Sequence, residues 1–203
     1  MLAVIDYGAG NLRSVLHALD YLKAESIRVV RHPHELQNAE KIILPGVGAF
    51  GAGMQQLEKQ GLVKPIRQAV AKGVPYLGIC VGMQFLFSVG EEMGEFEGLG
   101  ILPGRVVRFP TSERLKVPHI GWNELQPLCA SPLLANVPED SYAYFVHSYH
   151  CVPEDKSAII ASVDYGGTVA AAVQHDNIYG VQFHPEKSQR TGLQILQNFL
   201  TLA

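Results

Sequence analysis

The chain has 203 residues, of which 47% are hydrophobic and 17% charged, with a net charge of −3 and a pI of about 6.2. This balance is typical of a globular protein, and the slight negative charge disfavours nucleic acid or an anionic membrane as the main partner. No apolar stretch reaches the roughly 18 residues that span a bilayer, and the opening MLAVIDYGAGN lacks the features of a secretory signal. We therefore expect a cytoplasmic protein with one domain over residues 1–203.

The first half of the chain alternates short apolar strands with amphipathic helices. We expect Asn11 to cap the first helix. Because the strands are too apolar to have one wet face, the alternation predicts a mostly parallel sheet with helices on both faces. Strands are expected at residues 2–5, 26–30, 42–44 and 74–80, and helices at 12–22, at 54–70 in two pieces around Gly61, and at 83–90, which ends in Gly90.

The second half of the chain contains short strand candidates separated by turns. They are GRVVRF, YAYFVHSYH, SAIIASV, TVAAAVQ and IYGVQF, followed by a last helix at residues 189–202. We expect these strands to extend the same sheet, partly in antiparallel orientation. The predicted fold class is α/β, a three-layer open sheet with parallel central strands, added partly antiparallel strands and helices on both faces.

Cys80 lies between Gly78 and Gly82, where a predicted strand meets a predicted helix. This is the setting of a nucleophile elbow, a strained turn in which glycines avoid clashes between closely approaching chains. The backbone N–H of Val81 could then stabilise a developing oxyanion. The alternative is a buried thiol in an ordinary strand-to-helix turn. The three cysteines are too widely spaced for a zinc ligand pair or a disulfide framework.

A cysteine nucleophile needs a base, and His184 is the best candidate among the eight histidines. It ends the strand IYGVQF and precedes Pro185, which favours an extended backbone at His184. Because alternate residues of an extended chain point the same way, Glu186 could orient the imidazole while its other nitrogen faces Cys80. The alternative is a surface turn after a strand.

Two glycine-rich loops follow strands. The loop PGVG, residues 45–48, is expected beside the elbow at the carboxyl ends of the parallel strands, where its amides could approach a substrate carbonyl. A dinucleotide site at DYGAGN is rejected because Arg13 stands where the G-x-G-x-x-G pattern needs its last glycine. No Walker lysine and no metal cluster is found, so we expect neither a cofactor nor a metal.

Three motifs together resemble the class I triad glutamine amidotransferases: GICVGMQ, PGVGAF and FHPEKS. The chain is more closely similar to the glutaminase subunits of imidazole glycerol phosphate synthase. That resemblance also rests on IDYGAGNLRSV, LPGVGAFGAGM, PHIGWNEL and YFVHSYH, which occur in order over nearly the whole chain.

The resemblance implies a glutaminase in which Cys80 attacks the side-chain amide of glutamine and forms a thioester. His184 would shuttle protons and Glu186 would orient it, with the backbone N–H groups of Val47 and Val81 as the oxyanion hole. Substrate contacts are implied for Gly48, Gln84, Ser148 and Tyr149.

The resemblance also implies a heterodimer with a cyclase subunit of histidine biosynthesis, which would receive the ammonia. Asn11 and Lys187 would lie near that partner. Trp122, the one tryptophan, follows a proline and a glycine, so we expect it on a loop, where it would anchor the interface. The alternative for Trp122 is a core aromatic.

Three other functions are weighed. A glutaminase serving another synthase, such as one making pyridoxal phosphate, is disfavoured by DYGAGN and PHIGWN. A non-catalytic binding subunit is disfavoured by the intact set of Cys80, His184 and Glu186. A cysteine peptidase is disfavoured by Gln84 and HPEKS.

Overall fold

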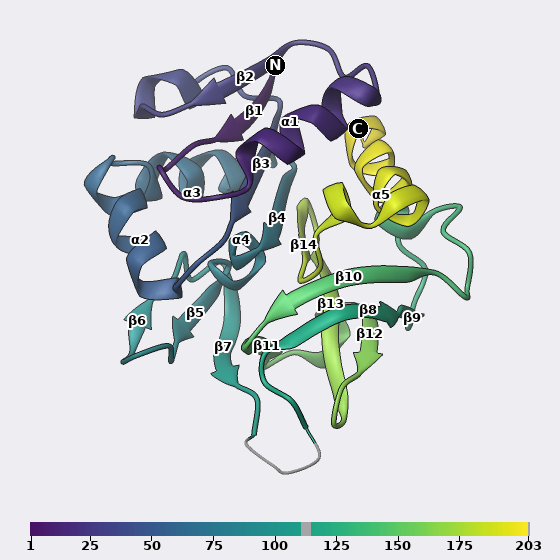
Figure 1. Cartoon of the computed structure of the whole chain (residues 1–203). Coiled ribbons are helices and arrows are strands. Elements are labelled where there is room, and N and C mark those ends of the chain that lie inside the picture. Colours follow the sequence, from purple (N-terminus) through teal and green to yellow (C-terminus); the bar gives the residue numbers. More distant parts are fainter. Residues whose placement is uncertain (111–114, 203) are drawn as a thin grey trace.

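The computed structural model describes residues 1–110 and 115–202 (Figure 1). Within them, the largest sheet has eight strands in the order β2-β1-β3-β4-β14-β13-β12-β9. Pairing is parallel from β2 to β14 and antiparallel from β14 to β9. The strands are β1 (Leu2–Ile5), β2 (Ile27–Val30), β3 (Lys41–Gly46), β4 (Tyr76–Cys80), β9 (Gln126–Pro127), β12 (Ile159–Asp164), β13 (Thr168–His175) and β14 (Ile178–Val181).

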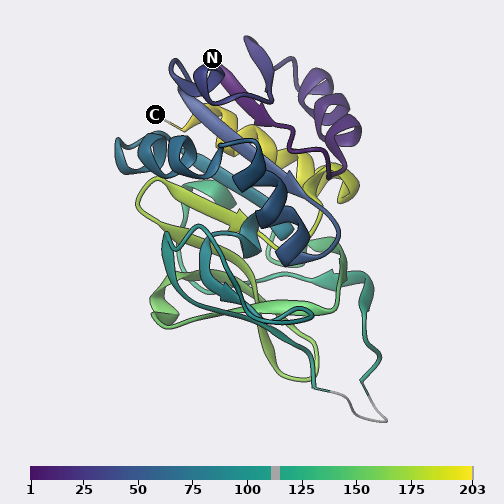
Figure 2. The ribbon, with the colours of Figure 1, turned by 90° about the vertical axis from the view of Figure 1, so that its left-hand side faces the viewer.

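Helices cover both faces of this sheet. On one side lie α1 (Leu12–Tyr21) and α5 (Gln189–Thr201), and on the other α2 (Phe50–Lys59) and α3 (Val63–Ala71) (Figures 1 and 2). Gly61 separates α2 from α3, as predicted. Strands β1 and β4 are buried along their whole length, which explains their uniformly apolar sequences. The predicted α/β class, with a parallel centre and added antiparallel strands, is confirmed.

The prediction that all later strands join the central sheet is wrong for two segments. GRVVRF lies in β7 (Leu102–Arg108), which forms a second sheet with β5 (Phe87–Gly90), β6 (Phe96–Glu97) and β11 (Tyr149–Pro153). YAYFVHSYH is interrupted at Ser148, so its first part, β10 (Tyr142–His147), pairs instead with β8 (His119–Glu124). Strand β10 alternates buried and accessible residues, a pattern that suits a small sheet with one open face.

The predicted helix at residues 83–90 is also wrong. The helix α4 covers only Val81–Gln84, and the chain then forms strand β5. Phe85, Leu86 and Phe87 are all fully buried, so this run has no polar face to distinguish a helix from a strand. Pairing of β5 with β6 and β7 decides the outcome, and no local signal encodes that pairing.

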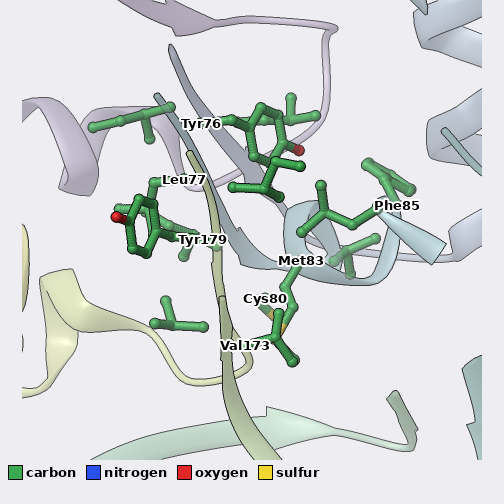
Figure 3. Close-up of a cluster of buried hydrophobic side chains, with 14 of the residues drawn as sticks. Tyr76, Leu77, Cys80, Met83, Phe85, Val173 and Tyr179 are labelled. Carbon is green, nitrogen blue, oxygen red and sulfur yellow. The ribbon is translucent and has the colours of Figure 1, made fainter. Parts of the chain in front are cut away.

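The core beneath the elbow joins the two halves of the chain (Figure 3). Tyr76 and Leu77 of β4, Met83 of α4, Val173 of β13 and Tyr179 of β14 are buried in this region, and Cys80 stands among them. Close packing of this kind fixes the end of β4 in place. The strand therefore presents Cys80 from a rigid base.

Candidate active site

Cys80 sits at a strained turn between β4 and α4. Its φ of 54° and ψ of −110° are unusual for a residue with a side chain. A Cβ atom on Gly78 would lie 2.3 Å from the carbonyl oxygen of Gly82, and one on Gly82 would lie 1.8 Å from that of Leu44. The two glycines are therefore required by close backbone approach, as the sequence predicted.

The glycine-rich loop lies beside this elbow, also as predicted. Strand β3 pairs in parallel with β4, and Gly46 stands directly opposite Cys80. A Cβ atom on Gly46 would lie 2.7 Å from the backbone nitrogen of Gly82, so the two turns are in contact. Gly48 has a φ of 92°, which favours glycine. Val47, between these glycines, is 37% exposed and borders the pocket in front of Cys80.

His184 and Glu186 are paired inside the protein. His184 Nδ1 lies 2.8 Å from Glu186 Oε1, and the two side chains are 2% and 0% exposed. His184 has the expected extended backbone, with φ −97° and ψ 98°. The extended geometry does not continue, however, because Pro185–Lys187 forms a 3-10 turn. This turn, rather than an extended chain, brings the carboxylate to the imidazole.

Asn11 and Ser188 hold this pair in place. Asn11 Nδ2 donates to Glu186 Oε1 at 2.9 Å, and Ser188 Oγ donates to the carbonyl oxygen of His184 at 2.7 Å. Asn11 occupies the N-cap position of α1, as expected, but its side chain makes no capping hydrogen bond. Its oxygen instead accepts a hydrogen bond from Ser14 Oγ at 2.7 Å, which directs its amide group toward Glu186.

The charges around His184 favour its protonated form. Burial lowers the pKa of His184, but Cys80 and Glu186 raise it by more, to a net value of about 9. His184 Nε2 is buried without a hydrogen-bond partner, and it faces the same pocket as Cys80. The imidazole is therefore oriented by Glu186 at one nitrogen, which leaves the other available for proton transfer.

These groups meet in a pocket of about 420 Å³. A volume of this order suits a small-molecule ligand. A second hollow of about 580 Å³ near the start of α5 contains no member of the triad, so the smaller pocket is the better candidate. Predicted residues that border the 420 Å³ pocket are Val47, Gly48, Cys80, Val81, Gln84, Ser148, Tyr149 and His184.

Gln182 was missed at the level of sequence. It is fully buried, and its Nε2 lies 3.8 Å from Cys80 Sγ. Its Oε1 accepts a hydrogen bond from Gln84 Nε2 at 3.1 Å, so two carboxamides lie side by side next to the thiol. The available signal was the spacing: Gln182 precedes His184 by two residues, and alternate residues of a strand face the same side.

Trp122 and Lys187 lie outside the pocket lining. The prediction that Trp122 is on a loop is wrong, because it belongs to β8 and pairs with Tyr144 of β10. Pairing with β10 explains why Trp122 lies in a strand rather than a loop, because strand formation depends on a pairing partner as well as on the local sequence. Trp122 is 47% exposed, so it is not a core aromatic, and Lys187 Nζ lies 5.9 Å from the Tyr144 ring centre.

Comparison with known proteins agrees with this geometry. The family Glutamine amidotransferase class-I matches residues 3–203. The chain belongs to the class I glutamine amidotransferases. It is 50% identical over 204 residues to the imidazole glycerol phosphate synthase subunit HisH of Syntrophotalea carbinolica, covering 98% of each chain. It is 47% identical over 207 residues to the HisH subunit of Salinibacter ruber, covering 100% of this chain and 94% of the relative.

These identities place this amidotransferase among the HisH subunits, in histidine biosynthesis. The fold is also shared with more distant proteins. A solved structure of PurLQS from Thermotoga maritima superimposes with a TM-score of 0.76 at 21% identity, covering 98% of this chain and 96% of the other. At that identity the likeness concerns the fold alone.

Proposed function

We propose that this amidotransferase hydrolyses glutamine at Cys80 and passes the ammonia to the cyclase subunit of imidazole glycerol phosphate synthase. The observation that carries the site assignment is that Cys80, on its strained elbow, and His184 border the same pocket, with His184 paired to the buried carboxylate of Glu186. A nucleophile, a base and an orienting carboxylate in this order make up the general arrangement for acyl transfer.

In the first half of the reaction, His184 already holds the proton of the Cys80 thiol on Nε2, and the thiolate sulfur attacks the amide carbon of glutamine. The negative charge that develops on the amide oxygen is stabilised by hydrogen bonds from the backbone N–H groups of Val47 and Val81. His184 then protonates the departing nitrogen, the carbon–nitrogen bond breaks, and ammonia leaves behind a glutamyl thioester. Glu186 stabilises the imidazolium until it gives up this proton.

In the second half, His184 removes a proton from water, and the hydroxide oxygen attacks the thioester carbon. The carbon–sulfur bond breaks, Cys80 recovers the proton, and glutamate is released. One glutamine and one water thus give one glutamate and one ammonia. Gly48, Gln84, Ser148 and Tyr149 border the pocket, and we assign them to substrate positioning.

The partner surface that we propose is the outer face of the β8–β10 ribbon. Exposed apolar side chains gather there: Val146 pairs with Ile120, and Trp122 pairs with the half-buried Tyr144. Val146 also borders the pocket of Cys80, so this surface reaches the mouth of the active site. A partner docked there would cover the pocket and keep ammonia from water, where it would be protonated and lost. Lys187 lies beside Tyr144 on the same surface.

We assign the reaction to the cytoplasm. The three cysteines are free, and two of them, Cys80 and Cys151, are buried. In the part of the chain that the structure describes, no helix is both long and apolar enough to cross a membrane.

Within residues 1–110 and 115–202, no group of histidine, cysteine and carboxylate side chains could hold a metal ion. The mechanism above uses side chains and water alone.

Glutamate release from glutamine tests the proposal. The wild-type chain and Cys80→Ala are assayed alone, with the cyclase subunit, and with that subunit and its nucleotide substrate. Hydrolysis that is stimulated by the partner and lost in Cys80→Ala is expected. Equal hydrolysis by Cys80→Ala would contradict the site assignment, and hydrolysis indifferent to the cyclase subunit would contradict the partner.

A further inference from the structure

The inner face of the β8–β10 ribbon carries two buried histidines. His119 and His147 stand directly opposite each other in the antiparallel register and are 3% and 7% exposed. His119 Nδ1 lies 3.0 Å from His147 Nε2. Neither side chain has a part in the hydrolysis described above. Two imidazoles in hydrogen-bond contact inside a protein need a reason, because each must be kept neutral and paired.

The hydrogen bonds fix where each proton lies. His147 Nδ1 is 2.8 Å from the carbonyl oxygen of Tyr149, which can only accept, so the proton of His147 is on Nδ1. Its Nε2 must then accept from His119 Nδ1–H. That leaves His119 Nε2 as an acceptor, and Asn123 Nδ2 lies 3.4 Å from it. Burial lowers the pKa of His119 to about 4 and that of His147 to about 3, so both are neutral near pH 7.

The same chain of bonds continues to the nucleophile. The Tyr149 carbonyl also accepts from Gln84 Nε2 at 3.1 Å, and the other proton of that amide goes to Gln182 Oε1 at 3.1 Å. Gln182 Nε2 in turn lies 3.8 Å from Cys80 Sγ. The series of contacts therefore runs from Asn123 on the ribbon to the thiol in the pocket, with the Tyr149 carbonyl and the Gln84 amide each making two hydrogen bonds. A connected hydrogen-bond network inside a protein restricts the movement of its members.

Aromatic rings pack against both imidazoles. His119 stacks between Tyr165, at 3.8 Å between ring centres, and Phe145, at 4.8 Å. Phe109 lies 5.2 Å from His147 by the same measure. These rings exclude water from the pair and restrict rotation of the imidazoles. A displacement of β8 would therefore be transmitted to His147 and the Tyr149 carbonyl.

We propose that the His119–His147 pair is a positioning element for glutamine hydrolysis. It sets the Tyr149 carbonyl, and through it the carboxamides of Gln84 and Gln182 beside Cys80, according to the position of the strand that carries Trp122. This inference rests on the proposed function, because Trp122 is assigned there to the cyclase interface. Docking of the cyclase subunit on the outer face of the ribbon then affects the positions of the pocket side chains through the two histidines on its inner face.

His119 is the better of the two for a test, because His147 borders the substrate pocket and His119 does not. In the complex with the cyclase subunit, His119→Leu removes the donor to His147 Nε2. We expect kcat/KM for glutamate release to fall about tenfold. His119→Asn offers an amide proton near the position of Nδ1, so it is expected to recover most of this loss. His175→Asn, at an exposed histidine that ends β13, is the control and is expected to stay near wild type.

A spectroscopic measurement on the unmodified chain needs no substitution. In the ¹⁵N-histidine-labelled complex, the two-bond nitrogen–proton correlations of the imidazoles are expected to give the Nδ1–H tautomer for both His119 and His147 at neutral pH. In His119→Leu, His147 is expected to keep its proton on Nδ1, because the Tyr149 carbonyl still accepts it, but the Nε2 signal of His147 is expected to shift because that nitrogen loses its donor. An Nε2–H tautomer for His147 in the wild-type chain would overturn the proposal, and it decides the matter if His119→Leu does not fold.

The remaining outcomes separate this inference from the proposed function. A folded His119→Leu with wild-type kcat/KM overturns the positioning role. Equal losses in His119→Leu and His119→Asn, without a shift of the His147 Nε2 signal, assign the pair to packing alone and also overturn it. Hydrolysis that survives Cys80→Ala would instead defeat the proposed function, whatever the histidine variants do.

Discussion

His184 and Glu186 form an ion pair that is closed to solvent, with 2.8 Å between Nδ1 and Oε1. The carboxylate has one further donor, Asn11 Nδ2, at the same oxygen. Glu186 Oε2 is buried without a partner. Glu186 therefore supports catalysis in two ways. Its negative charge stabilises the protonated imidazole, and its hydrogen bond to Nδ1 fixes the tautomer of His184.

Glu186→Gln is therefore expected to lower kcat for glutamine hydrolysis by about a hundredfold or more, with a smaller effect on KM. The amide has nearly the same shape, so the fold should be kept, but it cannot stabilise the imidazolium. The measurement is steady-state glutamate release in the complex with the cyclase subunit. Asn11→Ala, which removes one donor to the same oxygen, is the graded comparison and should cost less. A kcat equal to wild type in Glu186→Gln would contradict the assigned role.

The raised pKa of His184 predicts a pH-dependent contribution to stability. Its folded value is about 9 against an ordinary 6.5. A group whose pKa is raised on folding stabilises the protein fully below its unfolded pKa, and that stabilisation is lost as the pH rises through the folded pKa. The difference in unfolding free energy between wild type and His184→Asn should thus shrink by roughly 3 kcal/mol between about pH 6 and pH 10. Denaturant titrations at several pH values measure it, and a constant difference would refute the prediction.

The candidate reactive centre could be proposed from the sequence because its signals are local. Gly78, Cys80 and Gly82 encode an elbow, and His184 is separated from Glu186 by one residue. The structure places Cys80 and His184 on the border of one pocket, at the end of β4 and just after β14, two strands whose parallel pairing the apolar sequences predict. Asn11 shows the limit of this reasoning: its partner Glu186 is 175 residues away, and no local pattern indicates that contact.

Sheet membership was not predictable from the sequence for the same reason. Residues 87–90 form a strand only because β6 and β7 are available to pair with them. The break at Ser148 sends β10 and β11 to different sheets, although the segment reads as one strand. The His119–His147 contact depends on that arrangement. Long-range pairing, rather than side-chain periodicity, thus determined the features that were missed.

The close approach of the elbow and the glycine-rich loop predicts a steric defect in Gly82→Ala. The added Cβ would lie 1.8 Å from the backbone oxygen of Leu44, immediately before Pro45 and Gly46. Backbone must move to relieve this contact, so we expect a loss of about 2 kcal/mol or more in the free energy of unfolding, together with loss of hydrolysis. Gly73→Ala is the control: it has a positive φ but open space, and should cost about 1 kcal/mol without loss of activity. Equal effects would show that the elbow tolerates displacement.

The outer face of the ribbon predicts how the complex is held together. Trp122 is 47% exposed, and its ring lies 6.0 Å from that of Tyr144, so it is supported in one orientation without being buried. Exposed tryptophans that become covered on association are frequent hot spots. Trp122→Ala should weaken binding of the cyclase subunit by more than about 1 kcal/mol, which is at least fivefold in Kd.

The comparison for Trp122→Ala is Tyr21→Ala. Tyr21 is also an exposed aromatic, but it ends α1 and does not border the pocket. Titration calorimetry gives both Kd values, and the midpoint of thermal unfolding should be unchanged in each variant, since neither side chain is in the core. A loss of affinity confined to Trp122→Ala would place the partner on the ribbon. If the two variants bind the cyclase subunit equally, the apolar surface that adjoins the pocket through Val146 is not where the partner docks, and another face must cover the departing ammonia.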